Sequence, residues 1–168
     1  MKILLQSKRV KLDLFTKNKV NKNYKKWMND KVVTKYLVKS NYTTIKQLKS
    51  FVGSIDNPEN YFFRIIDIKS NRHIGNVRIG PLNLRNKSSG FGIMIGNKKF
   101  HNKGYAKEVT ALCVDFLFYF LRFKKIKFDC HINNMAAMRL YENLGFTKKI
   151  KNNRMVFFSK TNKKYYKF

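Results

Sequence analysis

The segment from Gly90 to Phe146 constrains the fold of this chain more than any other part of the sequence. It begins with a short apolar run, residues 91–96, which glycines bound as they would a buried strand. A turn containing Gly104 follows, and over residues 105–123 apolar side chains recur at three- and four-residue intervals, which is helical spacing. A strand that leads through such a turn into a helix directs free backbone N–H groups and the positive end of the helix dipole at one point. The sequence therefore predicts a phosphate-binding turn at Gly104.

The second half of the segment predicts another strand and a capped helix. Residues 125–132 are typical of a strand, and residues 133–146 are typical of a helix with both ends marked. Asn134 is a good N-cap, because its side chain can accept a hydrogen bond from the first helical turn. Gly145 stands where a helix would end in a left-handed residue.

This arrangement resembles the acetyl-CoA-dependent N-acetyltransferases of the GNAT superfamily. The last helix of that family reads Asn-x-x-Ala-x-x-x-Tyr-x-x-x-Gly-Phe. This chain matches the pattern in register at Asn134, Ala137, Tyr141, Gly145 and Phe146.

The turn matches the family pattern Gln/Arg-x-x-Gly-x-Gly/Ala with one departure. Gly104 and Ala106 agree with it, whereas His101 stands where the pattern has Gln or Arg. In the branch that acetylates ribosomal-protein N-termini and amino-sugar nucleotides, this position is often aromatic. We therefore expect the backbone N–H groups, rather than the His101 side chain, to hold the cofactor's pyrophosphate.

The resemblance implies the fold class α/β (α+β). We expect a single GNAT-like domain over residues 1–168, with a mixed, mostly antiparallel central sheet flanked by helices and a splayed cofactor-binding strand. Residues 74–146 would form the acetyl-CoA-binding core, and residues 147–168 the closing strands and a basic tail. Further expected strands cover residues 7–14, 61–68 and 73–81, and expected helices cover residues 24–28, 32–37 and 45–52. Trp27 is expected in the core, and Pro81 is expected to end strand pairing, because proline cannot donate to a sheet ladder.

The same resemblance supplies a cofactor-binding set for acetyl-CoA. It consists of Ile93, Met94, Ile95, His101, Asn102, Lys103, Gly104, Tyr105, Ala106, Asn134 and Tyr141. Backbone N–H groups around Met94 and Ile95 are the candidates for stabilising a tetrahedral oxyanion. Asn134 would hydrogen-bond the pantetheine arm, or would act as the helix cap alone.

Tyr141 and His131 are the predicted catalytic residues. Tyr141 matches the family position of the acid that protonates the departing thiolate; the structural alternative is that it packs against the sheet. Many relatives place an acidic base just before the cofactor strand, but this chain has Ser-Ser-Gly at residues 88–90. A water chain, a histidine (His131 or His73) or no dedicated base remain as alternatives. Glu108 is expected to interact with the helix dipole or to be a solvated residue, rather than to act as a base.

Composition bounds the class of protein and its partners. The 37 Lys and Arg residues against 9 Asp and Glu residues give a net charge of +28, which attracts polyanions. The lysines are scattered and accompanied by many asparagines, which favours a compositional bias over a dedicated surface. The two cysteines, Cys113 and Cys130, lack metal-site spacing, so we expect buried reduced thiols in a cytoplasmic protein and no metal. No leader peptide is evident, and the longest apolar stretch, residues 109–121, is too short to span a bilayer.

These observations predict acetyl transfer from acetyl-CoA to a primary amine on a small molecule, with an amino-sugar nucleotide as the first choice. The alternative acceptor is a protein N-terminus, such as that of a ribosomal protein. Polyamines are the least favoured, because a charge of +28 repels cations. An alternative from a different class of function is a non-catalytic module of the same fold that binds polyanions through its basic surface. The oligomeric state stays open, with a homodimer among the alternatives.

Overall fold

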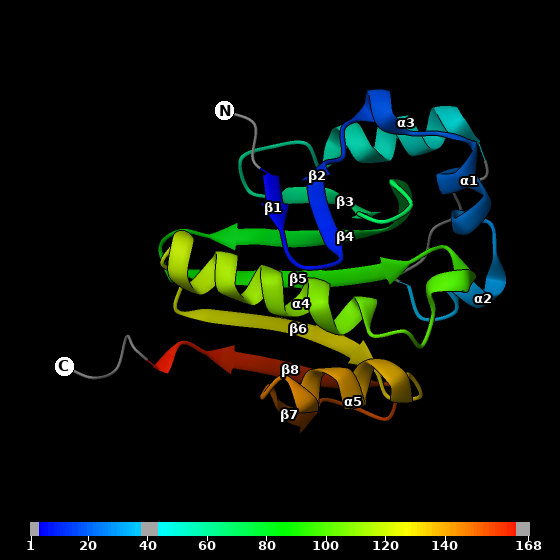
Figure 1. Cartoon of the computed structure of the whole chain (residues 1–168). Coiled ribbons are helices and arrows are strands. Elements are labelled where there is room, and N and C mark those ends of the chain that lie inside the picture. Colours follow the sequence, from blue (N-terminus) through cyan, green and yellow to red (C-terminus); the bar gives the residue numbers. More distant parts are fainter. Residues whose placement is uncertain (1–3, 38–43, 164–168) are drawn as a thin grey trace.

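A computed structural model describes residues 4–37 and 44–163, and its centre is one eight-stranded sheet (Figure 1). The strands follow the order β1-β2-β3-β4-β5-β6-β8-β7. Only β5 and β6 pair in parallel; every other neighbouring pair is antiparallel. The mixed, mostly antiparallel sheet is therefore confirmed. In chain order the strands are β1 (Leu4–Gln6), β2 (Val10–Leu14), β3 (Tyr61–Asp67), β4 (Arg72–Asn83), β5 (Ser88–Ile95), β6 (Lys125–His131), β7 (Thr147–Ile150) and β8 (Met155–Thr161).

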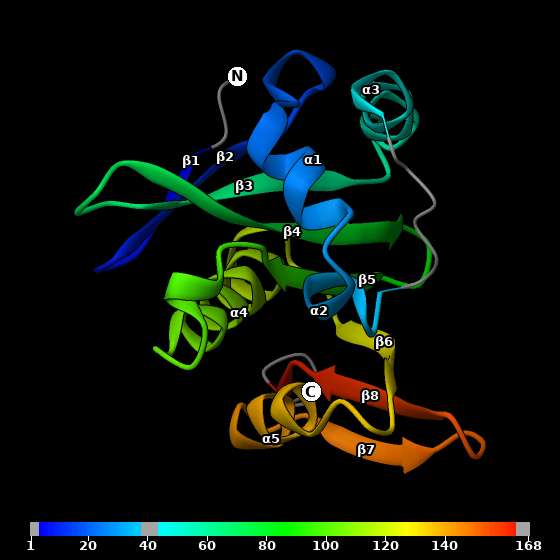
Figure 2. The same ribbon diagram turned by 90° about the vertical axis from the view of Figure 1, so that its right-hand side faces the viewer.

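Helices cover both faces of the sheet (Figure 2). They are η1 (Lys17–Lys19), α1 (Lys22–Met28), α2 (Lys31–Thr34), α3 (Ile45–Ser54), η2 (Lys98–Phe100), α4 (Tyr105–Asp115), its π-helical continuation η3 (Phe116–Phe120) and α5 (Met135–Asn143). Helices α4 and α5 cover one face, and α1 and α3 lie on the other. Side-chain hydroxyl and amide caps begin several of them; Thr44 and Gln47, for example, form a reciprocal capping box at α3.

Two apolar clusters fill the space between the sheet and these helices. The larger one joins the sheet to α4 and contains fully buried residues such as Val77, Val109 and Ile126. The smaller one lies under α1 and α3 and contains Tyr24 and Trp27, so the prediction that Trp27 belongs to the core is confirmed. The sheet separates the clusters, because side chains alternate between the faces of a strand: Met94 of β5 packs on the smaller cluster, and its neighbours Ile93 and Ile95 pack on the larger one.

The central feature of the sheet is the separation of β5 from β6. Their parallel pairing is limited to Ser88 with Lys125 and Ser89 with Ile126. Beyond these residues β5 stays paired with β4, while β6 pairs with β8 along its whole length. The two strands therefore part, and the predicted splayed strand is confirmed.

Three sequence expectations differ from the structure. The strand expected over residues 7–14 is confined to β2, and residues 7–9 form the turn to β1, which the sequence did not predict. Pro81 does not end the pairing: β4 resumes with Leu82 opposite Ser89 after an irregularity in the register. The helix expected over residues 105–123 changes to π-helical geometry at Phe116.

Candidate active site

The backbone of β5 presents free hydrogen-bonding groups to the gap between β5 and β6. The N–H of Gly96 donates to the carbonyl of Ile74 at 2.9 Å, so Gly75 and Ile95 face each other as a non-hydrogen-bonded pair. In such a ladder the N–H groups of Ile93 and Ile95 point away from β4, whereas that of Met94 points toward it. Of the two predicted oxyanion donors, Ile95 is therefore directed into the gap and Met94 into the ladder.

The loop before α4 offers a row of unpaired donors. The backbone N–H groups of residues 102–107 donate no hydrogen bond to any other described residue. Residues 102–104 are exposed, and the row coincides with the positive end of the α4 dipole. Gly104 has a φ of +80°, and a Cβ there would lie 3.3 Å from the Arg9 guanidinium. This backbone cradle fits the phosphate-binding turn that the sequence predicts.

His101 fixes the loop to the end of β5. Its Nε2 lies 2.7 Å from the carbonyl oxygen of Ile95, and because a carbonyl only accepts, Nε2 carries the proton. The Nε2–H of His101 is thus already used in a hydrogen bond to the protein's own backbone. This geometry agrees with the expectation that the backbone, and not the His101 side chain, meets the anion.

The β1–β2 turn clamps the start of α4, which sequence reasoning missed. Glu108 accepts hydrogen bonds from the Ser7 hydroxyl at 2.7 Å and the Arg9 N–H at 2.8 Å, and its Oε2 lies 2.6 Å from Arg9 Nε. Arg9 also donates to the carbonyl of Lys103 at 2.9 Å and lies over the Tyr105 ring. Burial alone would raise the pKa of Glu108, but these hydrogen bonds and the Arg9 charge outweigh it and lower that pKa. Glu108 therefore holds the β1–β2 turn against the first turn of α4, a role that the sequence did not predict.

Tyr141 lies across the point where β5 and β6 part. Its ring contacts Phe128 of β6 at 4.6 Å and Phe91 of β5 at 6.3 Å, measured between centroids. The residue is 5% exposed, and its hydroxyl has no hydrogen-bond partner among the described residues. Burial raises the pKa of Tyr141, which keeps the phenol protonated. Packing and a role as an acid are compatible in this geometry.

Asn134 and His131 lie at the turn between β6 and α5. Asn134 caps α5, accepting from the Ala137 N–H at 3.3 Å, while its amide nitrogen keeps its donors. His131 Nδ1 accepts from the Asn133 N–H at 3.2 Å, so the basic ring atom is engaged. The His131 ring also packs on Tyr36, whose hydroxyl donates to the carbonyl of Asn133 at 2.9 Å. Tyr36 thereby links the segment after α2 to the far side of the gap, a contact between residues 97 positions apart that no local pattern signals.

His73, the other histidine considered as a base, is half-buried beside Trp27 of α1. Its Nε2 donates to the carbonyl of Gly75 at 2.9 Å, and its Nδ1 is buried without a partner among the described residues. Burial lowers the pKa of His73 to about 4, with the nearby Arg64 charge adding to the effect. The residue is neutral near pH 7 and packs against the ring of Trp27 at 4.9 Å.

The fold and this site define a class of protein. Residues 9–147 match the model of the acetyltransferase (GNAT) domain, and the chain belongs to this family. It is 28% identical over 96 residues to YokL, an uncharacterized SPbeta prophage-derived N-acetyltransferase of Bacillus subtilis (strain 168); the match covers 56% of this chain and 54%, or just over half, of that relative. The spermidine N(1)-acetyltransferase of Vibrio cholerae is 26% identical over 120 residues, covering 70% of this chain and 68% of the relative.

A solved structure shows the same fold. The spermidine N-acetyltransferase from Vibrio cholerae in complex with CoA and spermine superposes with a TM-score of 0.81 at 20% identity, over 94% of this chain and 98% of that one. The predicted GNAT fold is therefore confirmed.

Two features are absent from the part of the chain that the structure describes. Among residues 4–37 and 44–163, no group of three or more His, Cys, Asp or Glu residues could hold a metal ion. No helix in these ranges combines the length and the apolar character needed to cross a bilayer.

Proposed function

We propose that this protein transfers an acetyl group from acetyl-CoA to a primary amine. One observation carries the proposal: the opening between β5 and β6 is bordered by the unpaired N–H groups of residues 102–107, by the outward N–H groups of Ile93 and Ile95, and by Tyr141. These groups match three requirements of the reaction. The loop N–H groups can bind pyrophosphate, the strand N–H groups can donate to an oxyanion, and Tyr141 can protonate a leaving thiolate.

In this proposal the chain's own groups act as follows. The loop N–H groups hold the pyrophosphate, and the amide of Asn134 is available to the pantetheine arm. The N–H of Ile95 stabilises the negative charge that develops when the amine attacks the thioester carbonyl; one such donor is worth roughly 3–4 kcal/mol in a preorganised site. Tyr141 then gives its proton to the CoA sulfur as the carbon–sulfur bond breaks. The proton that the amine nitrogen loses on forming the amide passes to solvent water, and a proton from solvent restores the phenol.

The amine has to reach the thioester carbonyl in its neutral form, and neither histidine considered as a base suits this task. Desolvation lowers the pKa of His73 to about 4, so it is a weak acceptor of protons. Nδ1 of His131 is engaged by Asn133. We therefore assign deprotonation to water, and His131 a positioning role beside Tyr36 rather than the catalytic role that the sequence predicts.

The acceptor that we propose is an amine on an anionic small molecule, with an amino-sugar nucleotide as the first example. Five of the nine acidic side chains are already held in ion pairs with Lys or Arg, namely Asp13, Asp30, Glu108, Asp129 and Glu142. Near the loop, Asp30 pairs with Lys98 at 2.6 Å. The positive charge that remains favours an anionic acceptor over a polycation.

Polyamines are the second candidate acceptor, on a specific observation. The curated relative and the solved structure from Vibrio cholerae named above are both called spermidine acetyltransferases, and no protein named above is called an amino-sugar acetyltransferase. These names favour a polyamine acceptor, whereas the net positive charge of this chain disfavours one. A direct comparison of acceptors decides between the two.

The test is release of the CoA thiol from acetyl-CoA with three acceptors: an amino-sugar nucleotide, spermidine and a peptide with a free N-terminus. Turnover with any of them establishes the transferase, and the preferred acceptor identifies the substrate class. Preference for spermidine would overturn the anionic acceptor while leaving the reaction intact. No turnover, together with no thermal stabilisation by acetyl-CoA, would refute the reaction and favour the non-catalytic polyanion-binding module.

A further inference from the structure

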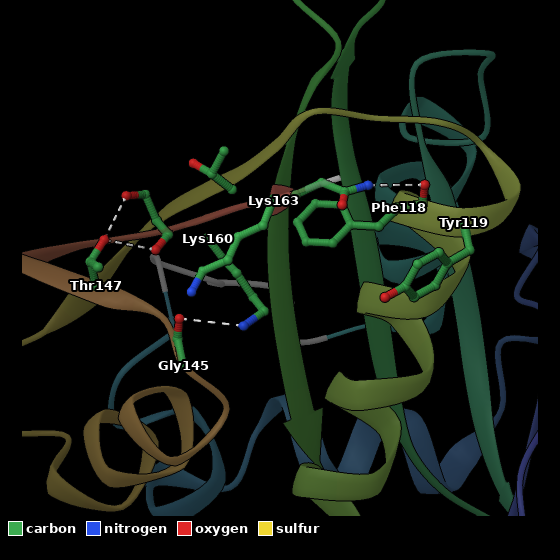
Figure 3. A pocket seen from close by; sticks show the side chains of 9 residues that line it. Phe118, Tyr119, Gly145, Thr147, Lys160 and Lys163 are labelled. Atoms are coloured by element: carbon green, nitrogen blue, oxygen red, sulfur yellow. Dashed lines mark hydrogen bonds between the residues drawn. The ribbon is translucent and has the colours of Figure 1, made fainter. Parts of the chain in front are cut away.

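A separate cavity of about 370 Å³ lies at the opposite end of the helix that starts at the cofactor loop (Figure 3). Its walls come from the π-helical end of α4, from the turn after α5 and from β7 and β8 with the residues that follow. None of the residues assigned above to the cofactor or to catalysis lines it. Its volume is at the lower end of the range of small-ligand sites, about 300–1,000 Å³.

Two ammonium groups give this cavity its charge. Lys160 Nζ donates to the carbonyl of Leu144 at 2.7 Å and lies 3.4 Å from that of Gly145, so the C-terminal carbonyls of α5 hold it in place. Lys163 lies beside it in the lining (Figure 3). No Asp or Glu lines the cavity, and neither lysine is ion-paired with an acid of the described residues.

The two ammonium groups repel each other. Burial lowers the pKa of Lys160, and the neighbouring Lys163 charge lowers it further. An anion placed between the two groups would relieve this repulsion, because an opposite charge favours the protonated form.

The remaining walls differ in chemistry from one side to the other. On one side the hydroxyl of Thr147 lies 3.0 Å from the carbonyl oxygen and 3.1 Å from the hydroxyl oxygen of Ser159. On the other side are the rings of Phe118, which is buried, and Tyr119, which is half-exposed (Figure 3). The cavity thus combines cations and hydroxyls with two aromatic rings.

We propose that this cavity binds a small organic phosphate that carries a planar ring. The phosphate would lie on Lys160 and Lys163 with the hydroxyls of Thr147 and Ser159, and the ring would pack against Phe118 and Tyr119. A dianion suits two adjacent ammonium groups, because lysine binds phosphate as a point charge. Aromatic rings pack well in offset or edge contacts with such a wall.

The probe is phenyl phosphate, titrated by calorimetry into the full chain in the presence of saturating CoA. Phenyl phosphate should bind more tightly than inorganic phosphate, which lacks the ring. Lys163→Gln should weaken phenyl phosphate binding about tenfold, as expected for one charge-assisted contact, and Tyr119→Ala should reduce its advantage over inorganic phosphate. Lys49→Gln, at an exposed lysine of α3, removes the same charge and should leave the affinity unchanged.

Three results would overturn the proposal. Equal effects of Lys163→Gln and Lys49→Gln would show that only the net charge matters. Equal binding of phenyl phosphate and inorganic phosphate would exclude the ring site. Binding that disappears when CoA is added would place the probe in the cofactor loop. The thermal midpoint of each variant is measured as a control. An unchanged midpoint shows that a loss of binding does not come from a loss of folding.

Discussion

Tyr141 combines a buried ring with a hydroxyl that has no partner among the described residues. The ring packs against Phe91, Phe128, Phe146 and Phe158, so packing depends on the ring and the proposed chemistry on the hydroxyl. A substitution can therefore separate the two roles.

Tyr141→Phe keeps the ring and removes the acid. We expect turnover to fall roughly tenfold or more, with acetyl-CoA affinity and the thermal midpoint nearly unchanged. Steady-state release of the CoA thiol, with calorimetric titration of acetyl-CoA, measures both quantities. Full activity in Tyr141→Phe would return the residue to a packing role alone.

His73 predicts how stability depends on pH. Its pKa is lowered from 6.5 to about 4, so the unfolded chain binds more protons than the folded one between these values, and stability falls as pH falls below 6.5. We expect the unfolding free energy to be about 2 kcal/mol lower at about pH 5 than at about pH 7.5. Urea denaturation at a series of pH values gives this slope.

His73→Gln is the control for this slope. It keeps a donor toward Gly75 but cannot take up a proton, so its stability should change much less over the same pH range. The lowered pKa values of Asp13, Asp67 and Glu108 act at lower pH, because such carboxylates lose their contribution only as pH falls below their ordinary values of 3.8 to 4.5. An unchanged slope in His73→Gln would contradict the assignment.

Among the elements, α4 links most features of the site. Its start carries the phosphate cradle, and the β1–β2 turn holds that start through Arg9 and Glu108. The position of the loop therefore depends on a contact between two segments far apart in the chain.

Arg9→Gln tests this dependence. It removes the ion pair with Glu108 and the bond to the Lys103 carbonyl, so acetyl-CoA affinity should fall about three- to tenfold. Because the Arg9 side chain is 41% exposed, we expect a loss of only about 1 kcal/mol in stability. Lys148→Gln, which breaks the surface pair with Glu142, is the matched control and should leave acetyl-CoA binding unchanged. Equal affinities in both variants would show that the clamp does not position the loop.

For the whole molecule, the net charge of +28 sets the response to salt. Charges of one sign repel one another in the compact state, and added salt screens that repulsion. Raising NaCl from about 0.02 M to about 0.2 M should therefore raise the thermal midpoint by about 2–4 °C, which corresponds to about 1 kcal/mol in a domain of this size. A constant or falling midpoint, measured by circular dichroism, would mean that the ion pairs outweigh the repulsion.

The fold and the main parts of the site were accessible from local sequence patterns. Gly104 at a left-handed turn, the helical spacing that follows it and the Asn134 cap depend on neighbours within a few residues, so the sequence displays them directly. The resemblance to a known family then placed Tyr141 at the site and implied the splayed sheet.

Other features were decided by tertiary structure, because they join residues that no short pattern connects. The Arg9–Glu108 clamp, the contact of Tyr36 with Asn133 and the cavity at Lys160 each bring together distant segments. Burial, which lowers the pKa of His73 and raises that of Tyr141, is likewise a property of the packed core. Local residue types fix which elements form, whereas the packing of those elements fixes which side chains remain free to react.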